Sequence, residues 1–168
     1  FVSVSAHPAN SAYPDPFLSV SCDDDTLVVQ SNGIPTYEYV DMTPNGLSAV
    51  DYTWEIPANP ALAAAPTDIP LLGTAAFTVA GLPIFGPNEA AQPDPYGDPV
   101  YNGIVDACLG HTGQGGSYHH HALLVSCVLS AVADDAPDMV VGYALDGFAI
   151  RGPVGCVDTE CGQTATYE

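Results

Sequence analysis

Short runs of alternating apolar and polar residues recur along this chain, and such alternation is typical of half-buried β-strands. Runs of this kind, or of β-forming residues, cover residues 1–5, 18–20, 27–30, 37–40 and 50–56. Proline, glycine or clustered aspartate separates them, and these residues favour turns. The pattern therefore predicts a domain built from many short strands.

Two longer segments repeat one pattern, because residues 74–87 align without a gap to residues 140–153. In both, an apolar strand leads into a residue-glycine turn and a second short apolar strand, with Phe77 and Tyr143 at equivalent positions. A turn of the Asp-Gly type between apolar runs is a strong hairpin signal. The repeat predicts duplicated hairpins in a pseudo-symmetric β-core.

Proline and glycine are dense at residues 57–70 and 87–106, which predicts long irregular loops there. The apolar residues 122–133 fit either a strand or a helix. We therefore expect a mainly-β fold, a small β-sandwich or barrel-like domain of short strands and hairpins with long Pro/Gly loops and little helix. A chain of this length forms one domain by default, and we assign residues 18–168 to it.

Residues 1–17 form a separate N-terminal element in this expectation, a strand arm on a proline-bearing tether. The strand-like residues 1–5 have two interpretations. The first is an edge strand of the domain's own sheet. The second is an arm that completes the sheet of a neighbouring subunit by strand addition, which predicts a homo-oligomer or polymer.

The net charge of the chain excludes some classes of binding partner. The chain carries 20 acidic residues and a single base, Arg151, for a formal net charge of −19. Phosphate backbones and anionic membrane surfaces are bound through Lys and Arg, so we expect no nucleic-acid partner. No apolar run reaches the ~20 residues of a membrane span. The charge suits binding to cations or to surfaces coated with ions or glycans, and the alternative is solubility alone.

Five cysteines in a small acidic chain indicate an oxidising compartment, and so an extracellular or cell-surface location. Cys108 and Cys127 bracket a histidine-rich segment and are expected to form one disulfide. Cys156 and Cys161 flank a short loop and are expected to form another, which leaves Cys22 without an assigned partner. The alternative for Cys108 is thiolate ligation of a metal.

The histidine-rich segment carries the candidate chemistry. His119 and His121 are two residues apart, so on a strand both imidazoles point to one face. A glycine-rich loop lets the chain fold His111 back onto that strand. Three converging imidazoles can hold a transition metal, and we count Asp106 with the metal group as an accessory or orienting carboxylate. The alternative is a hydrogen-bonded histidine cluster without metal.

The donor types favour some metals over others. Three nitrogen ligands favour zinc or copper, whereas calcium prefers oxygen ligands. The three adjacent aspartates at residues 23–25 offer oxygens of that kind, although their spacing matches no calcium loop and a solvated turn is the alternative.

The same segment resembles a known family. It reads Cys-Leu-Gly-His and then Gly-Ser-Tyr-His-His-His over residues 108–121, and Gly-Tyr-Ala-Leu-Asp-Gly-Phe-Ala-Ile-Arg-Gly-Pro follows at residues 142–153. This combination resembles the YHYH-domain family, named for a Tyr-His-Tyr-His motif, over about residues 30–153. His120 replaces the second tyrosine, on the strand face opposite the expected ligands. The resemblance implies an exported protein, often within a larger secreted or surface chain.

Two classes of function remain. The first is an exported metal-binding β-domain that acts as a structural subunit of an extracellular or surface assembly, such as a fibre linked by N-terminal strand exchange. The second is a secreted zinc- or copper-dependent enzyme with an open coordination position at the histidine site. No complete set of acid, base and nucleophile is evident, since Ser117 lies outside a Gly-x-Ser-x-Gly elbow. We therefore favour the first class.

Overall fold

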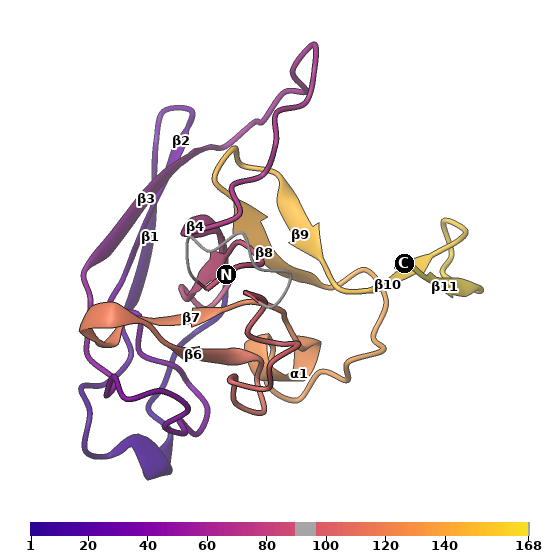
Figure 1. The fold of residues 1–168 in the computed structure, drawn as a ribbon. Helices are drawn as coiled ribbons and strands as arrows, with labels where there is room; N and C mark the ends of the chain where they lie inside the picture. Colours follow the sequence, from indigo (N-terminus) through magenta and orange to yellow (C-terminus); the bar gives the residue numbers. More distant parts are fainter. Residues whose placement is uncertain (90–96, 168) are drawn as a thin grey trace.

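The computed structural model describes residues 1–89 and 97–167, and within them the fold is mainly β (Figure 1). Short strands form three sheets, and the only α-helix in this part of the chain is the single turn α1 (Val125–Val128). This confirms the expected fold class. Of the loop expected over residues 87–106, residues 90–96 lie outside the described residues.

The strands are distributed unequally among the sheets. A three-stranded sheet has the order β1-β2-β3, with strands β1 (Leu18–Asp23), β2 (Thr26–Ser31) and β3 (Tyr52–Pro57). A six-stranded sheet has the order β6-β7-β5-β4-β8-β9, with strands β4 (Thr74–Thr78), β5 (Pro83–Phe85), β6 (Gly110–Thr112), β7 (Tyr118–His120), β8 (Val140–Ala144) and β9 (Ala149–Arg151). A small antiparallel pair, β10 (Val154–Cys156) and β11 (Thr164–Thr166), lies near the C-terminus.

Aromatic packing joins the two larger sheets. Alternation along β3 turns Trp54 and Ile56 inward, where they meet Val29 of β2 and the fully buried Phe77 of β4. The rings of Trp54 and Phe77 stack with centroids 4.5 Å apart. Burial of such large apolar side chains is the main favourable contribution to folding, so this stack anchors one of the buried hydrophobic clusters of the core.

The two repeated segments both form hairpins of the six-stranded sheet. β4 pairs with β5, β8 pairs with β9, and the two hairpins meet where β4 pairs antiparallel with β8. Phe77 lies opposite Tyr143 in that pair, the residue to which it aligns in sequence. Antiparallel pairing at equivalent positions is the arrangement that a local two-fold axis produces, while descent from a duplication stays a prediction.

Two expected strands are absent from the described structure. Residues 1–5 form no strand; they lie on their own domain, where the Val2 N–H donates to the Val79 carbonyl and Phe1 stacks on Tyr143 with centroids 5.2 Å apart. Exchange of this segment between copies stays a prediction.

Residues 37–40 also form no strand, because a buried side chain takes the hydrogen bonds that a neighbouring strand would need. The Asn10 amide donates to the Tyr37 carbonyl over 2.7 Å and accepts from the Tyr39 N–H over 2.9 Å. The alternating Tyr-x-Tyr pattern therefore serves ring packing rather than a sheet.

Two disulfides close loops of different length, and both pairings are those expected from the sequence. Cys108 pairs with Cys127 over a separation of 19 residues, and Cys156 pairs with Cys161 over a separation of 5. Cys22 is a free, exposed thiol. Within residues 1–89 and 97–167, no helix has the length and apolar character needed to cross a bilayer.

A glycine in β6 gives the first prediction. A Cβ at Gly110 would collide with the phenol of the fully buried Tyr118, whereas a Cβ at Gly46 would meet nothing within 4 Å. We expect Gly110→Ala to lower the free energy of unfolding by about 2 kcal/mol through overpacking, and Gly46→Ala to change it little. Urea unfolding of both variants measures this, and equal effects would contradict the packing described here.

The disulfides give the second prediction. In the chain-entropy description, removing the Cys108–Cys127 bond costs about 3 kcal/mol of unfolding free energy and removing the Cys156–Cys161 bond about 2 kcal/mol. Paired Cys-to-Ala variants, with Cys22→Ser as the control, measure both costs by urea unfolding. A larger loss for the shorter loop would show that loop closure does not govern these bonds.

Candidate metal centre

The β6–β7 hairpin brings three histidines to one face. His111 lies opposite His119 in the antiparallel register, and His121 directly follows β7, two residues beyond His119. The His121 N–H donates to the Leu109 carbonyl, which keeps it in line with the hairpin. The ring centroids lie 4.8 Å, 5.1 Å and 4.9 Å apart, so the three imidazoles that the sequence grouped do lie together.

The loop between the two strands needs its glycines. Gly115 and Gly116 have φ angles of +80° and +78°, a backbone region that side chains with a Cβ rarely adopt. A Cβ at Gly116 would also collide with the Gly46 carbonyl. These two residues therefore allow the tight return that places His111 beside His119.

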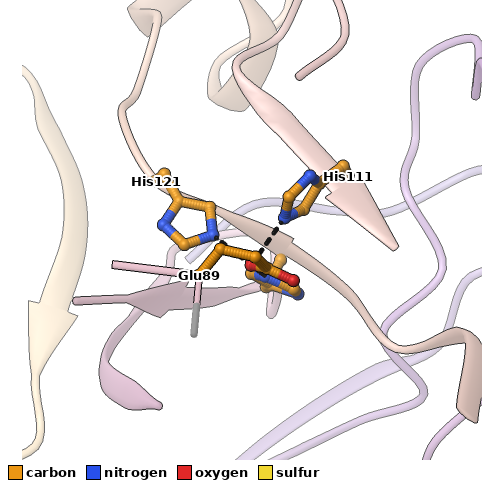
Figure 2. Close-up of side chains that lie close together, drawn as sticks. Glu89, His111 and His121 are labelled. Carbon is orange, nitrogen blue, oxygen red and sulfur yellow. Dashed lines mark hydrogen bonds and ion pairs between the residues drawn. The ribbon is translucent and has the colours of Figure 1, made fainter. Parts of the chain in front are cut away.

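Glu89 is a fourth member of the group, which the sequence analysis missed. β5 runs parallel to β7, with Ile84 beside His120, so the chain leaving β5 passes along the ligand face. The Glu89 Oε2 atom lies 2.9 Å from His111 Nε2, 3.2 Å from His121 Nε2 and 3.5 Å from His119 Nε2. Figure 2 shows the rings of His111 and His121 approaching Glu89 from two directions. We call these four residues the His3Glu group.

Hydrogen bonds fix the tautomer of all three imidazoles. Each Nδ1 atom faces a backbone carbonyl: His111 with Ile104 at 2.8 Å, His119 with Ser117 at 3.1 Å, and His121 with Gly86 at 2.9 Å. A carbonyl oxygen only accepts, so each Nδ1 carries a proton. In the neutral ring the Nε2 atom then carries a lone pair, and the three Nε2 lone pairs point toward one another.

Electrostatics keeps the group poor in protons. Burial, with repulsion from His121 and His111, lowers the pKa of His119 to about 4, and burial also lowers the pKa of His121. Burial raises the pKa of Glu89, but the attraction of His111 and His119 outweighs it, so the net shift is downward. At neutral pH His119, His121 and Glu89 therefore present acceptors to the centre.

The acceptors outnumber the protons that they share. One proton between His111 and Glu89 satisfies the 2.9 Å contact, but the buried Nε2 atoms of His119 and His121 have no hydrogen-bond donor. A buried polar atom without a partner costs about 1–3 kcal/mol. The donor atoms of the group all lie within 4.8 Å of one another, so one bound cation would satisfy them together. The residues present therefore fit a metal ion.

The group is enclosed by protein except at the carboxylate. The histidine side chains are at most 1% exposed, whereas Glu89 is 34% exposed. Phe85 stacks on His119 with ring centroids 3.9 Å apart, which covers that imidazole. Any exchange with solvent therefore involves the side of Glu89.

Asp106 lies outside the His3Glu group, and the hydrogen bonds of its carboxylate go to other partners, which corrects its expected role as an accessory or orienting carboxylate of the metal group. Its Oδ1 atom accepts from the N–H groups of Cys108 and Gly110 over 2.9 Å and 3.1 Å, and its Oδ2 atom accepts from the Tyr118 hydroxyl over 2.8 Å. One oxygen thus holds the turn before β6, and the other accepts from Tyr118 of β7. The aspartates at residues 23–25 also form no group of three or more ligating side chains within the described residues.

Comparison with known proteins agrees with the motif. Residues 53–168 match the family model described as YHYH protein, a span of more than half of the chain that includes Tyr-His-His-His at residues 118–121. Comparison with curated proteins and with solved structures gave no match. The extent of the family match shows that the chain belongs to the YHYH protein family.

Proposed function

We propose that this chain is an exported β-domain that binds one transition-metal ion, zinc or copper, through the His3Glu group. The observation that carries the proposal is the set of buried Nε2 lone pairs that face one another without donors. Three imidazole nitrogens and one carboxylate suit zinc or copper better than calcium, which prefers oxygen. The net charge of −19 also attracts cations toward the domain.

The ion's role in this proposal is structural. It would join the β6–β7 hairpin to the segment after β5, and these segments are far apart in sequence. Four protein ligands around a nearly buried centre are typical of structural zinc sites. The two disulfides suit an oxidising compartment, where we place the domain as a subunit of an extracellular or cell-surface assembly.

A second candidate function, a metal-dependent secreted enzyme, has its own support. Glu89 is the one exposed member of the group, and its displacement would open a coordination position. A groove of about 630 Å³ is lined by apolar residues that include Ile84, Phe85 and Ile150, and His121 also lines it. An open metal position beside such a groove is the arrangement that a metal-dependent enzyme needs.

Metal titration gives the third prediction. We expect the protein to bind one equivalent of Zn²⁺, and its free energy of unfolding to rise by about 2.7 kcal/mol when free metal is 100 times the Kd. His119→Ala should weaken binding by more than about tenfold, and Asp135→Asn, which removes an exposed carboxylate elsewhere, should not. Calorimetry and urea unfolding measure both effects. Equal Zn²⁺ affinity for His119→Ala and wild type would contradict the site.

Cobalt spectroscopy gives the fourth prediction and separates the two functions. If the site is structural, azide should leave the visible spectrum of the Co²⁺-loaded wild type unchanged, because Glu89 closes the coordination. Glu89→Gln should then become sensitive to azide, while Glu38→Gln, at an exposed carboxylate, should behave as wild type. A wild-type spectrum that shifts with azide would contradict the structural role and favour the enzyme.

A further inference from the structure

Strand β7, which carries candidate ligands, is also held by contacts on its opposite face. Side chains alternate along β7, so Tyr118 and His120 point to the face opposite His119. Both are completely buried, and both make side-chain hydrogen bonds on that opposite face. The motif at residues 118–121 thus divides into two candidate ligands in front and two anchored side chains behind.

The hydrogen bonds of His120 have a definite direction. Its Nδ1 atom lies 3.0 Å from the Cys108 carbonyl and must donate to it. With Nδ1 as the donor, the Nε2 atom of the neutral ring carries a lone pair on the other side of the imidazole. The Tyr37 hydroxyl lies 3.0 Å from His120 Nε2. Burial raises the pKa of Tyr37, so the hydroxyl stays protonated and donates a hydrogen bond to this atom.

These two bonds connect β7 to distant parts of the chain. Cys108 is held in turn by its disulfide to Cys127 and by the Asp106 carboxylate. Tyr37 precedes the family-matched residues 53–168, and its carbonyl accepts from the Asn10 amide. The N-terminal part of the chain therefore reaches β7 behind the metal centre through the Tyr37 hydroxyl, and it reaches β6 through the hydroxyls of Tyr39 and Thr43.

We infer that Tyr37 and His120 are positioning residues of the metal centre. Rotation of β7 about its axis would turn His119 and His121 away from Glu89, and the bonds of His120 to Tyr37 and Cys108 oppose that rotation. The histidine at position 120, where the family motif has tyrosine, supplies the ring acceptor that the Tyr37 hydroxyl needs. This inference rests on the proposed metal binding and adds to it the source of the ligands' orientation.

The substitution Tyr37→Phe tests the inference, and it is the fifth prediction. Loss of the hydroxyl leaves His120 Nε2 buried without a donor, so we expect Zn²⁺ affinity to fall by about tenfold and the visible bands of bound Co²⁺ to shift. Tyr13→Phe is the matched control, because the Tyr13 hydroxyl forms no side-chain hydrogen bond among those found in the described residues, although its ring packs on Tyr39. This control should keep the wild-type affinity and spectrum.

The outcomes separate this inference from the proposed function. If the wild type binds no metal, the proposed function fails. If the wild type binds but Tyr37→Phe keeps its affinity and Co²⁺ spectrum, even with a less stable fold, the positioning role is overturned.

Ring ¹⁵N spectra of the wild-type protein give a second test that does not depend on how a variant folds. We expect His120 to remain the Nδ1–H tautomer with an accepting Nε2 atom before and after Zn²⁺ is added. The Nε2–H tautomer in either state would overturn the inference.

Discussion

Three imidazole lone pairs and a carboxylate oxygen face one another inside this domain with too few protons to satisfy them. Because backbone carbonyls hold the Nδ1 protons of His111, His119 and His121, the rings cannot relieve the conflict by changing tautomer. Burial also disfavours protonation of His119 and His121. A bound cation would accept these lone pairs and remove the conflict. The need to hold that cation explains how the elements around the site are arranged.

The surrounding elements place the side chains of the His3Glu group around one centre. The antiparallel register of β6 and β7 sets His111 opposite His119, and the parallel contact between β5 and β7 brings the chain toward Glu89. Asp106 shapes the turn before β6, while the Cys108–Cys127 bond ties that turn to α1. Side-chain alternation then lets one short strand present ligands on one face and anchors on the other.

Local patterns carried much of this information in the sequence. The spacing of His119 and His121, the glycines before them and the bracketing cysteines all act within about twenty residues, so the hairpin and its disulfide were predictable. Glu89 was not, because its approach depends on a parallel strand contact that no periodicity encodes. Asp106 was predicted to accompany the metal ligands, but the nearby backbone N–H groups of Cys108 and Gly110 donate to its carboxylate instead. Tyr37 was expected in a strand, but the buried Asn10 amide takes its backbone hydrogen bonds.

Anomalous diffraction from crystals of the Zn²⁺-loaded protein, recorded at the zinc absorption edge, tests the central claim most directly. The account predicts one strong peak within about 2.0–2.1 Å of the Nε2 atoms of His111, His119 and His121. It would be contradicted by a metal bound through Nδ1 atoms, by zinc found only at surface carboxylates, or by three imidazoles turned away from a common centre.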